Sequence, residues 1–94
     1  MEITVHYFTV LRNVTKKRFE KIRIKQDSTL EDVLTVLVRR YGTDFERYVS
    51  SGKRRKGLRL VYLLNGQDIA QFNGLRTQLH DGDTVALMPP ISGG

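Results

Sequence analysis

Residues 28–42, STLEDVLTVLVRRYG, predict the main helix of the domain. Apolar side chains recur there every three or four residues and form one stripe: Leu30, Val33, Leu34, Leu37, Val38 and Tyr41. Ser28 and Glu31 have the spacing of a capping box, and Gly42 supplies the stop signal. A helix with a single apolar stripe must pack that stripe against another layer, so we expect a sheet beneath it.

Two predicted strands precede this helix and two follow it. Residues 2–11 and 18–25 alternate in the period of a strand, and a polar, basic turn over 12–17 separates them. The short connection predicts an antiparallel hairpin. After the helix, residues 58–64 and 84–88 give the third and fourth strands.

The connections carry ordinary turn chemistry. Residues 43–57 have no clear pattern and are expected to be the least ordered stretch. Asn65 and Gly66 form a turn signal, and the loop over 68–75 is expected to contain one short helical turn. The Asp-Gly-Asp of 81–83 is interpreted as another turn rather than as a pair of catalytic carboxylates.

The order of elements predicts an α+β domain over residues 1–88, in which one main helix packs on a mixed sheet of four to five strands. Residues 89–94 then form a flexible tail. In a β-grasp arrangement the first and last strands lie side by side at the centre of the sheet. Strand parity would place Phe8 and Met88 on the face opposite the helix, where exposed apolar side chains indicate a partner site.

Composition narrows the class of function. Ninety-four residues make one domain with little room for a deep cleft, which argues against a self-contained enzyme. Sixteen Lys and Arg against ten Asp and Glu give a net charge of +6, which favours an acidic partner. The absence of Cys excludes disulfides and thiolate chemistry on this chain's side chains. No apolar run approaches the ~20 residues of a membrane span, so we expect a cytoplasmic protein without a membrane partner.

Catalytic and metal motifs are missing from the sequence. It contains no GxGxxG, GxxxxGK[ST], HExxH or GxSxG pattern. His6 and His80 stand alone and are interpreted as surface side chains, so no metal site is expected. The basic run Lys53–Lys56 is interpreted first as a solvated loop. A charged contact with a partner and a nucleic-acid contact remain alternatives, although no aromatic residues are interleaved for base stacking.

The tail has a distinct chemistry. It consists of Pro89, Pro90, Ile91, Ser92, Gly93 and Gly94. The prolines favour an extended backbone, and at ~3.3 Å per residue the tail could project up to ~20 Å. Glycines fit a narrow channel, and Ile91 could anchor there. A free carboxylate is a poor electrophile, so another protein would have to activate it. Composition alone leaves a frayed terminus as an equal alternative.

Residues 64–66 read LNG and residues 79–94 read LHDGDTVALMPPISGG. Together they resemble the MoaD/ThiS family, and most closely the MoaD type, the small subunit of molybdopterin synthase. The family pattern is apolar-Asn-Gly, Leu-x-Asp-Gly-Asp-x-Val and Pro-Pro-apolar-x-Gly-Gly. Leu11 and Arg12 after the first strand also fit. The resemblance therefore covers nearly the whole chain.

The resemblance implies a ubiquitin-like β-grasp sulfur carrier that is not an enzyme on its own and binds no cofactor. A ubiquitin-activating-type enzyme would use MgATP to adenylate Gly94, and a sulfur-relay protein would then supply sulfur to give a thiocarboxylate. The tail, residues 89–93, would insert into the large subunit of molybdopterin synthase. There the thiocarboxylate would donate sulfur to precursor Z (cyclic pyranopterin monophosphate) during molybdenum or tungsten cofactor synthesis.

The resemblance also implies a docking face. Phe8 and Met88 align with the family's hydrophobic docking positions, Ile69 would complete the face, and Arg12 matches a basic residue after the first strand. The free protein is expected to be a monomer that does not bind nucleic acid. Many family members are acidic where they dock, whereas this chain is basic.

Two other functions are compatible with the same tail. One is a ubiquitin-like modifier whose Gly94 is joined to lysines of target proteins. The other is a sulfur donor for thiamine synthesis or tRNA thiolation, in which Pro-Pro is less typical. A nucleic-acid module ranks last.

Overall fold

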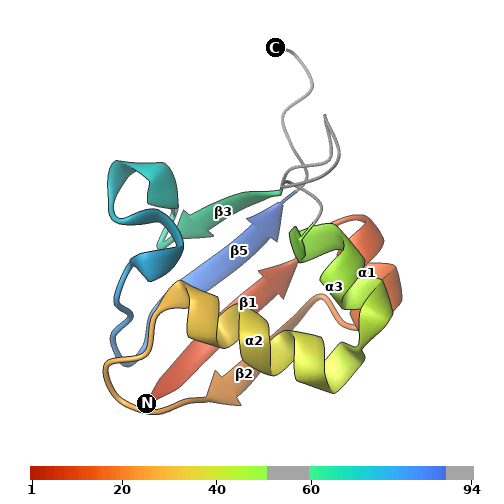
Figure 1. Cartoon of the computed structure of the whole chain (residues 1–94), viewed down its shortest axis with the longest axis horizontal. Coiled ribbons are helices and arrows are strands. Elements are labelled where there is room, and N and C mark those ends of the chain that lie inside the picture. Colours follow the sequence, from red (N-terminus) through yellow and green to blue (C-terminus); the bar gives the residue numbers. More distant parts are fainter. Residues whose placement is uncertain (51–59, 89–94) are drawn as a thin grey trace.

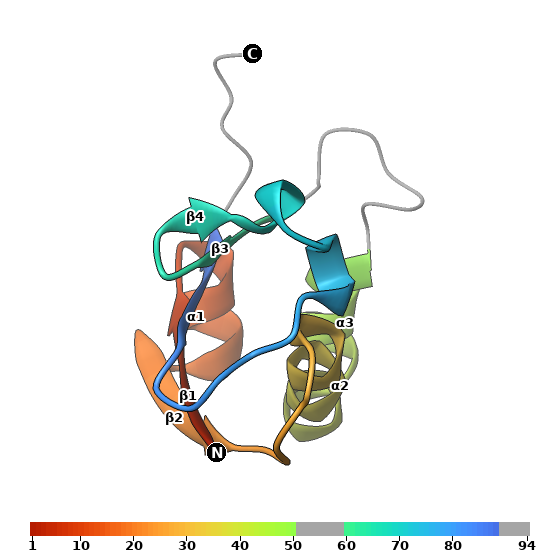
Figure 2. The ribbon, with the colours of Figure 1, turned by 90° about the vertical axis from the view of Figure 1, so that its left-hand side faces the viewer.

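The computed structural model describes residues 1–50 and 60–88. A sheet and a layer of helices make up the described part (Figure 1; Figure 2). The elements are β1 (Glu2–Tyr7), α1 (Val10–Thr15), β2 (Phe19–Arg23), α2 (Leu30–Tyr41), α3 (Thr43–Ser50), β3 (Val61–Leu64), β4 (Gln67–Asp68), the 3-10 helices η2 (Ile69–Gln71) and η3 (Gly74–Arg76), and β5 (Thr84–Met88). Helix α2 lies across one face of the sheet (Figure 1).

Within residues 1–50 and 60–88 the sheet has five strands in the order β2-β1-β5-β3-β4. Its two central strands, β1 and β5, are parallel, with Tyr7 opposite Leu87, and the other pairs are antiparallel. The first and last strands therefore lie side by side at the centre. This confirms the predicted α+β, β-grasp architecture with a mixed sheet.

The core lies between the sheet and α2. Alternate residues of the two central strands face the helix and are fully buried, as are three residues of the helix stripe: Ile3, Val5, Tyr7, Val85, Leu87, Leu30, Val33 and Leu37. The predicted strand parity is therefore correct, because the intervening residues must point to the opposite face of the sheet.

The first predicted strand and the turn after it were partly wrong. Strand β1 ends at Tyr7, and residues 10–15 form the short helix α1 instead of a strand end and a turn. Leu11 and Thr15, one helical turn apart, are both buried beneath it. Lys16, with φ +64°, ends the helix. A six-residue helix rich in β-branched residues is too short to show its period in the sequence.

A second unpredicted helix, after α1, lies in the stretch 43–57, where little order was expected. Residues 43–50 form α3, which follows α2 directly after Gly42. Its Phe45 is fully buried and stacks on Tyr41 of α2, with ring centroids 5.8 Å apart. Phe45, Tyr48 and Val49 have helical spacing and pack on the core, but three apolar positions in an eight-residue helix repeat too few times to predict it from the sequence.

The predicted cap of α2 was displaced by one residue. Thr29, rather than Ser28, is the N-cap: its hydroxyl accepts from the Asp32 amide at 3.3 Å, and the Asp32 carboxylate accepts from the Thr29 amide at 2.9 Å. Ser28 is buried, and its carbonyl accepts from the Leu79 amide. The capping box therefore exists, with different members.

Glu20 is a buried carboxylate that joins the sheet to the helix layer. It accepts hydrogen bonds from the hydroxyls of Tyr7 and Tyr41, from Arg40 Nη1 at 2.8 Å and from Lys17 Nζ at 3.2 Å. Burial alone would raise the pKa of Glu20, but the bonds from both tyrosines and Lys17 outweigh it and lower that pKa. Burial also raises the pKa of Tyr7, and its bond to Glu20 raises it further. The carboxylate is therefore ionised and fully paired at neutral pH.

Candidate functional site

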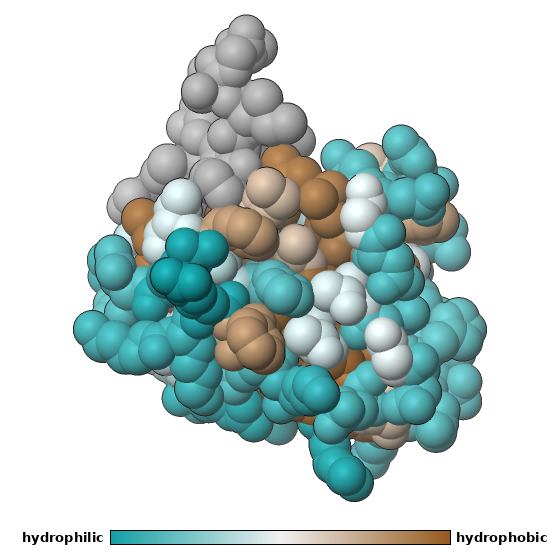
Figure 3. All heavy atoms as spheres, turned by 180° about the vertical axis from the view of Figure 1, so that it is seen from behind, coloured by the Kyte–Doolittle hydropathy of each residue, from teal (hydrophilic) through white to brown (hydrophobic). Residues whose placement is uncertain are grey.

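An apolar patch covers part of the sheet face opposite α2. We call it the open-face patch; its members are Phe8, Val61, Leu63, Ala86 and Met88, all partly exposed. Strand pairing places Val61 opposite Met88 and Leu63 opposite Ala86. The sheet viewed from the side opposite α2 shows apolar atoms gathered over its upper half (Figure 3).

Phe8 and Arg12, both predicted docking residues, lie in contact. The Arg12 guanidinium carbon is 5.3 Å from the centroid of the Phe8 ring, and Arg12 Nε donates to the Tyr7 carbonyl at 3.0 Å. Helix α1 turns the chain back after β1 and so places Arg12 over the ring. The exposed cation can reach an acidic group of a partner while the ring remains available for apolar contact.

Met88 joins Phe8 in the patch as strand parity predicted, but Val61, Leu63 and Ala86 were not named as site residues. The signal that could have found them is the same parity. Leu64 of β3 is buried, so Val61 and Leu63 alternate with the core-facing positions and point outward. The five-residue apolar run over 60–64 hid that alternation.

Ile69, predicted to complete the docking face, has a different position. Its side chain is 7% exposed and belongs to the core. It begins η2, where the Asp68 carboxylate caps the turn by accepting from the Ala70 amide at 2.9 Å. This turn folds Ile69 inward, so it adds almost no surface to the open-face patch.

The predicted tail, Pro89, Pro90, Ile91, Ser92, Gly93 and Gly94, lies outside the described residues, as does the basic run Lys53–Lys56. Met88, the last described residue before the tail, is itself a member of the open-face patch. The patch therefore borders the point in the sequence where the tail begins.

The histidines have the surface positions that were predicted. His6 stacks on Phe19, with ring centroids 5.5 Å apart, and His80 is exposed with its Nδ1 4.0 Å from an Asp83 carboxylate oxygen. Over residues 1–50 and 60–88, no group of three His, Cys, Asp or Glu side chains could hold a metal ion. No helix of this described part is long and apolar enough to cross a membrane.

The carboxylates of 81–83 serve the local structure. Asp81 Oδ1 accepts from the Glu2 amide at 2.7 Å, and Asp83 Oδ2 accepts from the His80 amide at 2.8 Å. Asp83 Oδ1 also accepts from Asn65 Nδ2 at 3.0 Å. These bonds support the turn interpretation over a catalytic pair.

Comparison with known proteins identifies relatives along the full length of the chain. It is 31% identical over 94 residues to small archaeal modifier protein 3 of Haloferax volcanii, with complete coverage of both chains. It is 32% identical over 95 residues to the sulfur carrier protein CysO of Mycobacterium tuberculosis, again with complete coverage. A solved BexX/CysO complex from Amycolatopsis orientalis contains a chain with a TM-score of 0.72 and 25% identity, covering 98% of this chain and 99% of that one.

The family model described as the ThiS family matches residues 5–94, nearly the whole chain. The predicted resemblance is thereby confirmed at the level of the family, and the relatives share the β-grasp fold. From the sheet order, the turn motifs and this match, the chain belongs to the ThiS family of ubiquitin-like sulfur carriers.

Proposed function

We propose that this chain carries sulfur as a thiocarboxylate on Gly94 and docks on its partners through the open-face patch. The observation that carries the proposal is the continuity between patch and tail: Met88 belongs to the patch, and the sequence PPISGG follows it directly. A partner seated on the patch would meet the chain where the tail starts. The small carriers of this family are non-catalytic, so the chemistry takes place in the partner.

The reaction on Gly94 needs two partner-catalysed steps. In the first, a carboxylate oxygen attacks the α-phosphorus of ATP, and pyrophosphate leaves with its Mg²⁺. In the second, a sulfur nucleophile from a relay protein adds to the acyl carbon, and AMP leaves. When that sulfur is the terminal atom of a persulfide, loss of AMP leaves an acyl disulfide. A thiol then cleaves its S–S bond, forms a disulfide with the relay cysteine and leaves the thiocarboxylate on Gly94. Gly93 and Gly94 carry no Cβ, which lets a narrow active site enclose the acyl carbon.

The patch supplies the docking energy in this proposal. Phe8 and Met88 each follow the paired residues Tyr7 and Leu87 and present large apolar side chains on the open face, and such side chains contribute much of the affinity of interfaces. Arg12 lies over the Phe8 ring and would steer an acidic partner. We place the protein in the cytoplasm, where ATP is available.

For the recipient of the sulfur, we propose precursor Z, with the chain acting as the small subunit of molybdopterin synthase. The supporting features are the Pro-Pro pair and the Asp-Gly-Asp turn at the spacing of the MoaD type. The large subunit would accept residues 89–94 and transfer sulfur to the pterin side chain.

A second candidate is a protein modifier in which Gly94 is joined to a lysine of a target. The relative from Haloferax volcanii, named a small archaeal modifier protein and 31% identical over its full length, favours it. Both functions begin with the same adenylate and differ in the nucleophile that follows.

The proposal is tested by intact mass after incubation with the adenylating enzyme, MgATP and a sulfur source. We expect a gain equal to the mass of sulfur minus that of oxygen, located on the C-terminal peptide. The variant that lacks Gly94 should fold normally and show no gain. Unchanged mass of the full chain under conditions that adenylate it would contradict the sulfur carrier.

A gene deletion distinguishes the two candidate functions, sulfur donation to precursor Z and protein modification. A strain without the gene should lose molybdenum-cofactor activity, and the full-length chain should restore it. If cofactor activity is normal in that strain, and lysine adducts of the chain are found on other proteins, the modifier replaces the synthase subunit.

A further inference from the structure

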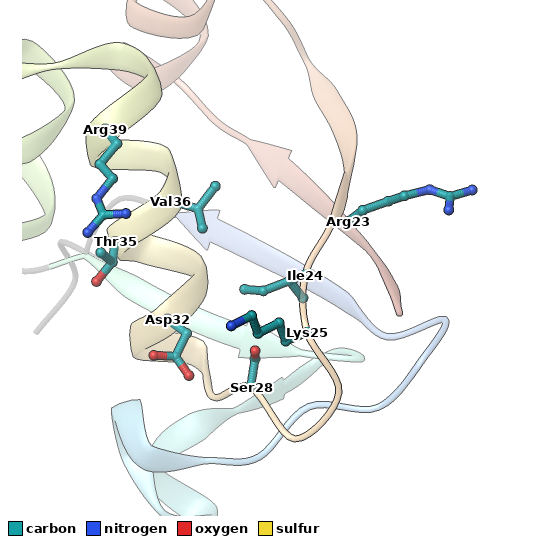
Figure 4. Close-up of a pocket in the computed structure, with 8 residues that line it drawn as sticks. All are labelled: Arg23, Ile24, Lys25, Ser28, Asp32, Thr35, Val36 and Arg39. Atoms are coloured by element: carbon teal, nitrogen blue, oxygen red, sulfur yellow. The ribbon is translucent and has the colours of Figure 1, made fainter.

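The edge of the sheet formed by β2 borders an open groove. Strand β2 is the outermost strand on its side of the sheet within the described ranges. The groove, of about 710 Å³, lies between the end of β2 and α2. Ile24 and Val36 point into it from opposite sides, while Arg23 points away toward the other face of the sheet (Figure 4). An extended chain laid beside β2 would therefore have an apolar surface on one side.

Alternate residues of β2 direct their backbone amides and carbonyls toward this free edge, and the remaining residues pair with β1. The Ile24 amide donates to the Met1 carbonyl at 3.0 Å, and the Tyr7 amide donates to the Arg18 carbonyl at 2.8 Å. Because backbone bonds alternate along an antiparallel pair, every second residue of β2 pairs with β1. The amides and carbonyls of Lys21 and Arg23 then face outward, in position to pair with an added strand.

Cationic side chains lie near these outward-facing backbone amides and carbonyls. Lys21, Arg23 and Lys25 are exposed, and Arg39 of α2 lines the same groove. Among the described residues none of these four forms an ion pair, whereas Lys17 and Arg40 nearby both pair with Glu20. The acidic side chain lining the groove, Asp32, is already bonded to Thr29 in the helix cap. The edge therefore presents uncompensated cations.

We propose that the β2 edge binds an extended, acidic segment of a partner protein by strand addition. Acidic residues of the segment lie opposite Lys21 and Arg23 on the open face of the sheet. The alternate residues are apolar and enter the groove against Ile24 and Val36. Backbone bonds to β2 provide affinity, and the alternation of charge and apolarity provides specificity.

The same observations favour a protein segment over a nucleic acid. The residues that line the groove include no aromatic side chain for base stacking, and two of them, Ile24 and Val36, offer apolar contact instead. An outward-facing strand edge offers pairing groups that match a peptide backbone. None of these residues belongs to the open-face patch, so a partner could hold this edge while another occupies the patch.

The test uses a fluorescein-labelled peptide of alternating Asp and Val and measures fluorescence anisotropy at about 0.15 M salt. We expect saturable binding of the full chain. A control peptide of the same composition, with its Asp residues grouped at one end, should bind about tenfold more weakly because it cannot match the alternation. In hydrogen exchange, the Lys21 and Arg23 amides should become protected only with the alternating peptide.

A matched pair of variants isolates the edge. Lys21→Glu with Arg23→Glu should weaken binding about tenfold, since both cross-strand charge pairs become repulsive. Arg47→Glu with Arg76→Glu changes the net charge equally at exposed positions of α3 and η3, and should stay within about twofold. Circular dichroism would confirm that both variants are folded.

Three outcomes would overturn the proposal: equal loss of binding in both variants, equal binding of the two peptides, or no protection of the two amides. Single-stranded RNA is measured in parallel. RNA binding that exceeds peptide binding and is lost in the Lys21→Glu, Arg23→Glu variant would assign the edge to nucleic acid instead.

Discussion

Arg40 of α2 contacts Glu20 of β2, with 2.8 Å between Nη1 and Oε1, across the boundary between the helix layer and the sheet. The Glu20 side chain is 8% exposed, while that of Arg40 is 46% exposed. The ion pair therefore has one buried member, and the tyrosine hydroxyls complete the shell of the carboxylate. Removing that charge leaves several donors without their acceptor, and unpaired donors in a buried site lower the free energy of unfolding.

Glu20→Gln should lower the free energy of unfolding by about 2 kcal/mol, because the amide replaces a charged acceptor and cannot satisfy all four donors. Urea denaturation followed by circular dichroism measures the change. Glu46→Gln is the matched control, since Glu46 is exposed on α3, and should stay within about 0.5 kcal/mol. Equal stability of the two variants would contradict the role given to Glu20.

The lowered pKa of Glu20 predicts a pH dependence. A carboxyl whose pKa is lower in the folded state than its usual 4.5 stabilises the fold above that pH and loses this contribution as the pH falls through the native pKa. The free energy of unfolding of the wild type should therefore fall more steeply than that of Glu20→Gln between about pH 5 and pH 3. Parallel slopes over this range would show that Glu20 does not titrate differently in the two states.

Strand parity and the helix stripe made the architecture predictable. Alternation in 2–11 and 84–88 identified which residues enter the core, and the period of 28–42 identified α2. Helices α1 and α3 escaped prediction because they span only six and eight residues, so their apolar spacing does not repeat often enough to establish a period. Tertiary contacts, such as that of Phe45 with Tyr41, determine such short helices.

The site was partly predictable for the same reason. Parity identified Phe8 and Met88, and the family resemblance added Arg12, which the structure brings to the Phe8 ring. Ile69 was misplaced because the sequence of a loop does not show which way a 3-10 turn directs its first side chain. The β2 edge had no motif at all, since it depends on which strand lies outermost.

Hydrogen bonds of the Asn65 side chain connect the turn after β3 to the start of β5. Asn65 has φ +50°, its Nδ2 donates to Asp83, and its Oδ1 accepts from the Thr84 amide at 2.9 Å. Asn65→Ala should lower the free energy of unfolding by about 2 kcal/mol, because it loses both bonds and adopts a left-handed conformation unfavourable for Ala. Asn65→Gly keeps the conformation and should lose only the bonds.

Asn73→Ala is the control for that turn. Asn73 has a negative φ and makes no side-chain capping bond at the start of η3, so its replacement should cost less than about 0.5 kcal/mol. Thermal and urea denaturation measure the stabilities of the three variants, Asn65→Ala, Asn65→Gly and Asn73→Ala, and so give their order. If Asn73→Ala and Asn65→Ala are equally destabilised, the bonds of Asn65 do not hold the turn.

Phe8→Ala tests the open-face patch and should weaken binding to the adenylating enzyme at least about tenfold, because a large apolar side chain at the centre of an interface carries much of the affinity. Phe8 is partly exposed, so the fold should lose little stability. Phe72→Ala is the control: Phe72 is 44% exposed and follows η2, which lies on the same side of the sheet as α2 (Figure 2). Titration calorimetry with the purified enzyme gives the affinities. A fall in melting temperature above about 5 °C in Phe8→Ala would make Phe8 a core residue, and equal affinities of the two variants would remove the patch from the docking surface.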